Sequence, residues 1–166
     1  MIRRIVSIAV VFTLVCQVFL CTGLEAYASN ASAFLAVQKA YGSSYPMSSS
    51  NEIKTARKNI FGKYSKVLGV SAKNFKSYKA ARKADSSQEY VCAVFKATNK
   101  NKVKTIKKAL KKYVKKEKSS NANYFTSYGK QLLDNAKVGS KGKYVYLFIL
   151  DTSKNSKAVQ AFKNNV

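Results

Sequence analysis

The sequence contains no histidine and no tryptophan, and it has only seven acidic residues. Histidine is the commonest general base near neutral pH and a common zinc ligand, so its absence argues against acid–base catalysis and against a zinc site. The acidic side chains are scattered, and only Asp85 and Glu89 lie close together in the sequence. We therefore expect a non-enzymatic protein without a metal ion or cofactor, although a carboxylate pair could still meet in the folded chain.

Cysteine is also scarce, with three residues in the chain. Cys16 and Cys21 lie in an apolar segment near the N-terminus, whereas Cys92 lies in a short apolar run, 90–95. If the N-terminal segment is removed, no internal disulfide can form, and the fold must depend on an apolar core. We expect Cys92 to be a small buried apolar residue.

Residues 1–28 have the three parts of a secretory signal peptide. Two arginines form a charged start, residues 5–24 form an apolar run, and the segment ends in Ala26-Tyr27-Ala28. We predict cleavage between Ala28 and Ser29, with Ala26 as the second small residue of the cleavage site. The protein is then secreted or associated with the cell envelope.

Two other kinds of leader fit this segment less well. A retained anchor needs about 20 clean apolar residues, but Thr13 and Gln17 interrupt the run. A lipoprotein needs a small residue directly before the modified cysteine, and here bulky Leu20 precedes Cys21. Both features favour a cleaved leader without a lipid anchor.

Positive charge dominates the rest of the composition. The chain has 31 basic residues and a formal net charge of +24, whereas 46% of its residues are hydrophobic. This apolar fraction is enough for one folded domain of ordinary size. Because few acids are available for pairing, most lysines must face solvent or an anionic partner.

The hydrophobic pattern predicts alternating helices and strands. Strands are expected where apolar residues are continuous, at 90–97 and 144–150, and a lysine-rich edge strand is favoured over a helix at 75–83. A turn is expected at 139–142. Helices are expected at 30–41, from residue 51 onward, at 102–118, within 124–136, and from Thr152 or Ser153 onward.

These elements predict an α+β fold with a small three- or four-stranded sheet and helices mainly on one face. Residues 29–50 would form an N-terminal helix and a serine-rich loop, and residues 51–166 would form the single α+β domain. The oligomeric state is not predicted by the sequence.

The segment 102–118 is the sharpest feature of the chain after the leader. An apolar stripe at helical spacing is expected to face the core, and it consists of Val103, Ile106, Leu110, Tyr113 and Val114. Lysines occupy the other faces, and five lysine pairs stand four residues apart. Their repulsion opposes the helix by about 1–2.5 kcal/mol at low salt. The predicted anion-binding residues are Lys104, Lys107, Lys108, Lys111, Lys112, Lys115, Lys116 and Lys118.

Export limits the choice of anion. It argues against nucleic acid and favours an anionic envelope polymer, such as a teichoic acid, or an anionic lipid surface. The competing interpretation is that these lysines are only solvated. Two other functions remain open, namely a secreted membrane-active effector or toxin and a small enzyme or inhibitor module.

The order of several short motifs resembles a known family. Glu89 opens the strand 90–96, the lysine helix follows it, and a glycine-lysine pair precedes the last strand. The other motifs are Ile60-Phe61-Gly62-Lys63-Tyr64, Leu68-Gly69-Val70, Tyr124-Phe125-Thr126-Ser127-Tyr128 and Gly142-Lys143-Tyr144-Val145. This order is similar to that of domain of unknown function 4358, found in small exported proteins of Gram-positive bacteria. The resemblance implies export and a small α+β domain, and it brings no catalytic residues.

Overall fold

The computed structural model describes residues 29–54 and 66–166. The described helices are α2 (Asn30–Tyr41), α3 (Lys100–Ser120), α4 (Ser127–Asp134) and α5 (Asn155–Asn164). The described strands are β1 (Lys66–Val67), β2 (Val70–Ser71), β3 (Phe75–Ala84), β4 (Glu89–Ala97), β5 (Lys137–Lys141) and β6 (Tyr144–Ile149). The predicted signal peptide and most of the helix predicted from residue 51 lie outside the described residues.

The fold is α+β, as predicted. Its main sheet has four antiparallel strands in the order β3-β4-β6-β5, and β1 and β2 form a separate two-stranded hairpin. The two most apolar segments, β4 and β6, occupy the centre of the main sheet. They have to be apolar on both sides, because each face of a central strand is buried when both faces of the sheet are covered.

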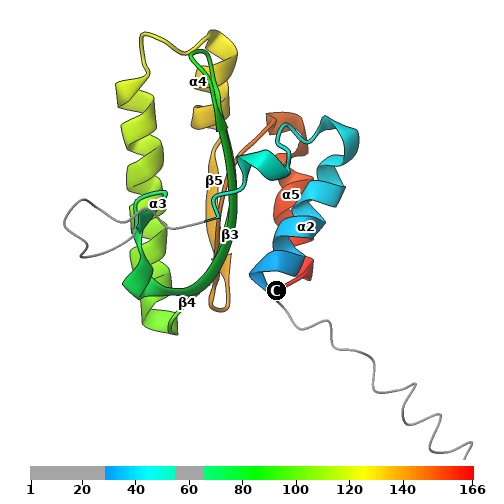
Figure 1. Ribbon diagram of the computed structural model, residues 1–166, viewed down its shortest axis with the longest axis vertical. Coiled ribbons are helices and arrows are strands. Elements are labelled where there is room, and N and C mark those ends of the chain that lie inside the picture. The colour runs from blue at the N-terminus through cyan, green and yellow to red at the C-terminus, as the bar shows by residue number, and fades with distance from the viewer. Residues whose placement is uncertain (1–28, 55–65) are drawn as a thin grey trace, which may run out of the picture.

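Helices cover both faces of the sheet (Figure 1). One face carries α3 and α4, and the other carries α2 and α5. This differs from the expectation that the helices lie mainly on one face. The physical reason is the alternation of the strands, since β4 points Val91 and Ala93 to the α3 side and Cys92 and Val94 to the α2 side.

The first helix completes the second of these two cores. Phe34 and Val37 of α2 are fully buried, and they pack in one cluster with Phe148 of β6 and Phe162 of α5. The rings of Phe162 and Tyr146 lie 4.6 Å apart. Residues 30–41 therefore share a core with the sheet.

The two edges of the sheet differ in how well the sequence predicts them. The lysine-rich segment 75–84 is an edge strand, β3, as favoured. The other edge was missed, because residues 137–141 form β5 instead of ending in a turn at Gly139. A Cβ atom at Gly139 would overlap the hydroxyl of Tyr146 on β6 and would lie 2.5–2.7 Å from its ring carbons. Glycine, which normally signals a turn, is here required by the close approach of an aromatic ring.

Residues 49–54 also depart from the prediction. Ser49–Asn51 form a short 3-10 turn instead of the start of an α-helix, and Glu52 then makes an isolated bridge to Ala81 of β3. The backbone N–H of Ile53 donates to the carbonyl of Ala80 at 2.8 Å. This short segment thus covers part of the β3 edge.

None of the helices within 29–54 and 66–166 has the length and apolar character required to cross a bilayer.

Candidate functional site

Helix α3 presents its lysines to solvent because its apolar stripe is committed to the core. Asn99 caps the helix by accepting a hydrogen bond from the backbone N–H of Lys102 at 3.1 Å. Ile106 and Leu110 are fully buried, and Val114 is 9% exposed. The predicted stripe is therefore confirmed, and the remaining surface of the helix faces outward.

The predicted anion-binding lysines all lie on this outward surface, which we call the lysine face. Lys107 is half-buried, and the other seven are exposed. Lys118 pairs with Asp134 at 2.8 Å, and the other seven make no ion pair with a described residue. The helix has 21 residues and is about 30 Å long, so the lysine face is an extended strip of positive charge.

A second feature lies beside this helix and was not predicted. Glu89, the first residue of β4, is fully buried. Its Oε1 accepts a hydrogen bond from Nε of Arg82 at 2.6 Å and another from the hydroxyl of Tyr113. Its Oε2 has no hydrogen-bond partner among the described residues. Burying a carboxylate costs free energy unless it is paired. The folded state therefore keeps Arg82 of β3 and Tyr113 of α3 in hydrogen-bonding contact with Glu89.

Glu117 completes this cluster from the next turn of α3. Its Oε2 lies 3.9 Å from Nη2 of Arg82 and accepts a hydrogen bond from the Asn121 amide at 3.1 Å. Burial and the negative charge of Glu89 raise the pKa of Glu117 above its ordinary value. Burial is the largest influence on the pKa of Arg82 and lowers it, but the hydrogen bond to Glu89 and the charge interactions with Tyr113, Glu89 and Glu117 together outweigh burial, so the net shift of the pKa is upward.

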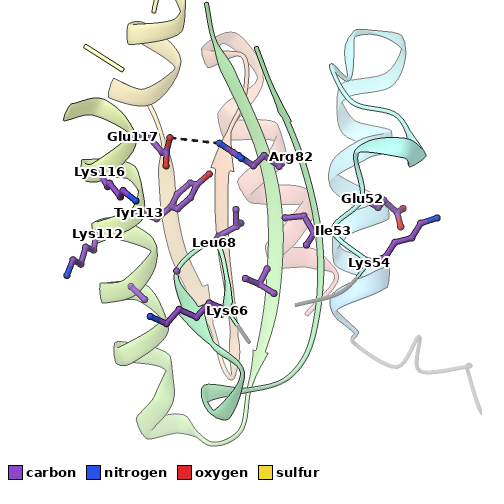
Figure 2. Close-up of a pocket in the computed structure, with 13 residues that line it drawn as sticks. Glu52, Ile53, Lys54, Lys66, Leu68, Arg82, Lys112, Tyr113, Lys116 and Glu117 are labelled. Carbon is purple, nitrogen blue, oxygen red and sulfur yellow. Dashed lines mark ion pairs between the residues drawn. The ribbon is translucent and has the colours of Figure 1, made fainter. Parts of the chain in front are cut away.

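The cluster forms one end of a pocket of about 730 Å³ between α3, the β1–β2 hairpin and β3 (Figure 2). Figure 2 shows Arg82 and Glu117 directed toward one another, with Tyr113 beside them. The apolar part of the wall comes from Ile53, Val67, Leu68, Gly69 and Ala109, and the remaining polar lining comes from Glu52, Lys54, Lys66, Lys112 and Lys116. Lys112 and Lys116 belong to both the pocket and the lysine face.

The shape of this pocket depends on an unusual turn. Leu68 and Gly69 join β1 to β2, and both have positive φ, 49° and 78°. Two consecutive residues with positive φ make the tight hairpin turn that matches the twist of the strands. The turn packs Gly69 against α3, where a side chain would come within 3.9 Å of the Ala109 carbonyl oxygen.

Asp85 and Asp151 do not join this site. Asp85 accepts hydrogen bonds from the backbone N–H groups of Ser87 and Gln88 in the β3–β4 turn, and its hydrogen bonds with Ser87 and Gln88 lower its pKa. Asp151 accepts a hydrogen bond from the Ser153 N–H at 2.8 Å, so it caps the turn before α5. Within the described ranges, no group of three potential metal ligands comes together.

The sequence contained only a weak signal for the Glu89 cluster. An acid next to an apolar strand normally marks the end of that strand, and nothing local indicates that Glu89 is buried. Arg82 reaches it because β3 and β4 form a hairpin in which Arg82 is opposite Val91. Tyr113 was assigned to the apolar stripe, and its hydroxyl had no predicted partner.

The fold and this site define a small basic α+β domain with a cationic helix beside a polar pocket. The chain belongs to the family described as Domain of unknown function (DUF4358), whose model matches residues 44–150. The match includes the sheet, the lysine helix and every lining residue of the pocket, and it excludes α2 and α5. No curated protein and no solved structure matches the sequence.

Proposed function

We propose that this protein is exported, has no enzymatic activity, and binds anionic polymers of the cell envelope through the lysine face of α3. The observation that carries the proposal is the absence of counter-charge on that face. Of its eight lysines, only Lys118 makes an ion pair to the described part of the chain. A helix that needs only solubility usually carries both signs of charge.

The energetics favour an anionic partner over solvent. Like charges four residues apart on a helix repel one another, and the attraction of a polyanion to each lysine would offset this repulsion. The buried apolar stripe argues against insertion of α3 into a membrane, because Ile106 and Leu110 are already used by the core. Binding at the surface of a polymer is the mode that leaves the fold intact.

The predicted leader fits the same proposal. Ser29 caps α2 by accepting a hydrogen bond from the Ser32 N–H at 2.9 Å. Cleavage between Ala28 and Ser29 would therefore leave α2 and its cap in the mature chain. Export then brings the lysine face to the compartment where anionic envelope polymers are found.

The test is binding of the mature protein to purified cell walls at increasing salt. The test variant replaces Lys107, Lys108, Lys111 and Lys112 by Gln. Each lysine near an anionic surface contributes about 1 kcal/mol, so we expect a loss of about 2–4 kcal/mol, or roughly 30- to 1,000-fold in affinity. Unmodified protein should also be released by salt, because the screening length falls from about 8 Å at physiological ionic strength to about 3 Å at 1 M.

A matched control removes the same charge elsewhere. It replaces Lys39, Lys83, Lys157 and Lys163 by Gln, all exposed and on the α2 and α5 side of the molecule. Lys83 belongs with this side because it follows Arg82, which faces α3, on the same strand. Equal loss in both variants, or binding that persists unchanged in high salt, would contradict the lysine face as the contact. Leakage of anionic vesicles would favour a membrane-active effector instead.

A further inference from the structure

The pocket beside α3 has a lining that a simple charged surface does not need. We infer that it binds one polyol phosphate unit, a phosphate group attached to a short hydroxylated carbon chain. This inference rests on the proposed function, since such a unit would be one repeat of the polymer that the lysine face attracts. Three properties of the pocket carry it: its charge, its apolar wall, and its fixed polar end.

The charge of the lining selects an anion. Glu52 is neutralised by Lys79, whose Nζ lies 2.6 Å from Oε2 of Glu52, and Arg82 is neutralised by Glu89. Glu117 is then the one acid among the described lining residues that opposes the lysines. The four lysines of the lining make no ion pair with any described residue, and they are Lys54, Lys66, Lys112 and Lys116. Ammonium groups are common phosphate ligands, so a phosphate is the group that this excess of positive charge favours.

The size and the apolar wall select a ligand larger than an inorganic ion. Small-molecule sites typically enclose about 300–1,000 Å³, and the pocket of about 730 Å³ falls in this range. Ile53 and Ala109 are half-buried and leave apolar surface against which a carbon chain can pack, and Leu68, which is 8% exposed, adds a smaller part. A phosphate alone would leave this wall uncovered.

The polar end supplies partners for hydroxyl groups. Glu117 is an acceptor that lines the pocket, and Arg82 has guanidinium N–H groups beyond the Nε that binds Glu89. Oε1 of Glu89 accepts hydrogen bonds from both Arg82 and Tyr113 and so fixes the positions of these two side chains. A buried carboxylate that orients two pocket residues is the kind of support that a preorganised binding site requires.

The proposal is tested by titrating the mature protein with glycerol phosphate and following the backbone amide signals by NMR. We expect saturable shifts at Gly69 and at Tyr113, which both line the pocket. Replacing Lys66 and Lys116 together by Gln should weaken binding by about tenfold or more, because charge-assisted hydrogen bonds to the phosphate are lost. The matched control, Lys157 and Lys163 replaced by Gln on α5, should bind like the unmodified protein.

Other ligands test whether the pocket requires both a phosphate and a carbon chain, and whether its ligand is a polymer repeat or a free metabolite. Inorganic phosphate should bind more weakly than glycerol phosphate, and glycerol alone should not shift these signals. A short glycerol phosphate oligomer should bind more tightly than the monomer if the pocket takes a polymer repeat, because it also reaches the lysine face. Equal affinity for monomer and oligomer would identify a free metabolite as the ligand and overturn the link to the polymer.

The two proposals can fail separately. The pocket assignment is overturned if glycerol phosphate shifts no signals around Gly69 and Tyr113, or if both double variants lose affinity equally. Salt-sensitive binding to cell walls would then still support the lysine face. Conversely, saturable glycerol phosphate binding in the pocket, together with cell-wall binding that does not weaken with salt, would support the pocket assignment and contradict the electrostatic function.

Discussion

The ion pair between Arg82 and Glu89 allows a sharp test of the site, through the variant Arg82→Met. Methionine keeps most of the length and apolar volume of arginine and removes only its charged group. The variant leaves the carboxylate of Glu89 in the core with the Tyr113 hydroxyl as its remaining hydrogen-bond donor. Its other oxygen already lacks a partner among the described residues, so the loss cannot be compensated locally.

The expected magnitude follows from the burial of the two partners. Removing one member of a buried ion pair typically costs about 3–5 kcal/mol. The side chain of Arg82 is 41% exposed whereas that of Glu89 is 0% exposed, so we discount this to about 2–4 kcal/mol. For a domain of this size, each kcal/mol lowers the melting temperature by roughly 3 °C. Thermal and urea unfolding, followed by circular dichroism, would measure both quantities.

The same strand offers a matched control. Lys79 also pairs with a carboxylate at 2.6 Å, but the side chains of Lys79 and Glu52 are 33% and 25% exposed. Lys79→Met should therefore cost less than about 1 kcal/mol. Adding Glu89→Gln to Arg82→Met should recover much of the lost stability, because the buried charge is then removed. The reasoning is refuted if the two methionine variants are equally stable, or if Glu89→Gln brings no recovery.

Two further predictions concern the surroundings of the site. Gly129→Ala should destabilise the protein by about 3 kcal/mol, because a Cβ at this position would lie 2.2 Å from the carbonyl oxygen of Ser87. Urea unfolding would measure this loss. The control variant Ser127→Ala, on the exposed side of the same helix, should lose much less stability. Glu117→Gln should raise the melting temperature at neutral pH. The raised pKa of Glu117 means that the folded state disfavours its ionised form. Protonated Glu117 therefore imposes no such cost below the ordinary glutamate pKa, and the protein loses stability as the pH rises through the pKa of Glu117 in the folded state. The advantage of the variant should therefore vanish in acid, and an advantage independent of pH would contradict the assigned cause.

Patterns confined to one segment were enough to predict a large part of the fold. The helix 30–41 and the two central strands follow from local periodicity and continuous apolar runs, and the structure confirms them. The same holds for the apolar stripe of α3 and for the burial of Cys92. In each case a single segment carries enough apolar surface to determine which of its sides is buried.

The lysine face follows from the same kind of information. Once Ile106 and Leu110 are placed in the core, helical geometry alone directs the lysines outward. Its position, its length and its charge are all properties of one continuous segment, so they can be deduced from the amino-acid sequence alone. Its partner stays a proposal, because charge selects the sign of a ligand and not its identity.

The features that the sequence did not predict depend on contacts between segments. β5 carries glycine and serine, and it is a strand only because β6 offers it an edge to pair with. The division of the helices between both faces depends on the order of strands in the sheet, which no single segment contains. The strand at 137–141 and the helical layer on the second face of the sheet could therefore not be predicted from local sequence patterns.

The sequence by itself determined the α+β class and a helix with one apolar side and one basic side, and its N-terminal segment predicts export. Only the tertiary structure decided that Glu89 is buried, that Arg82 and Tyr113 meet on its carboxylate, and that a pocket opens beside them. The physical reason is distance along the chain. Periodicity reports which side of a segment is buried, whereas an ion pair or a pocket wall depends on which segments become neighbours, and that is set by the packing of the whole domain.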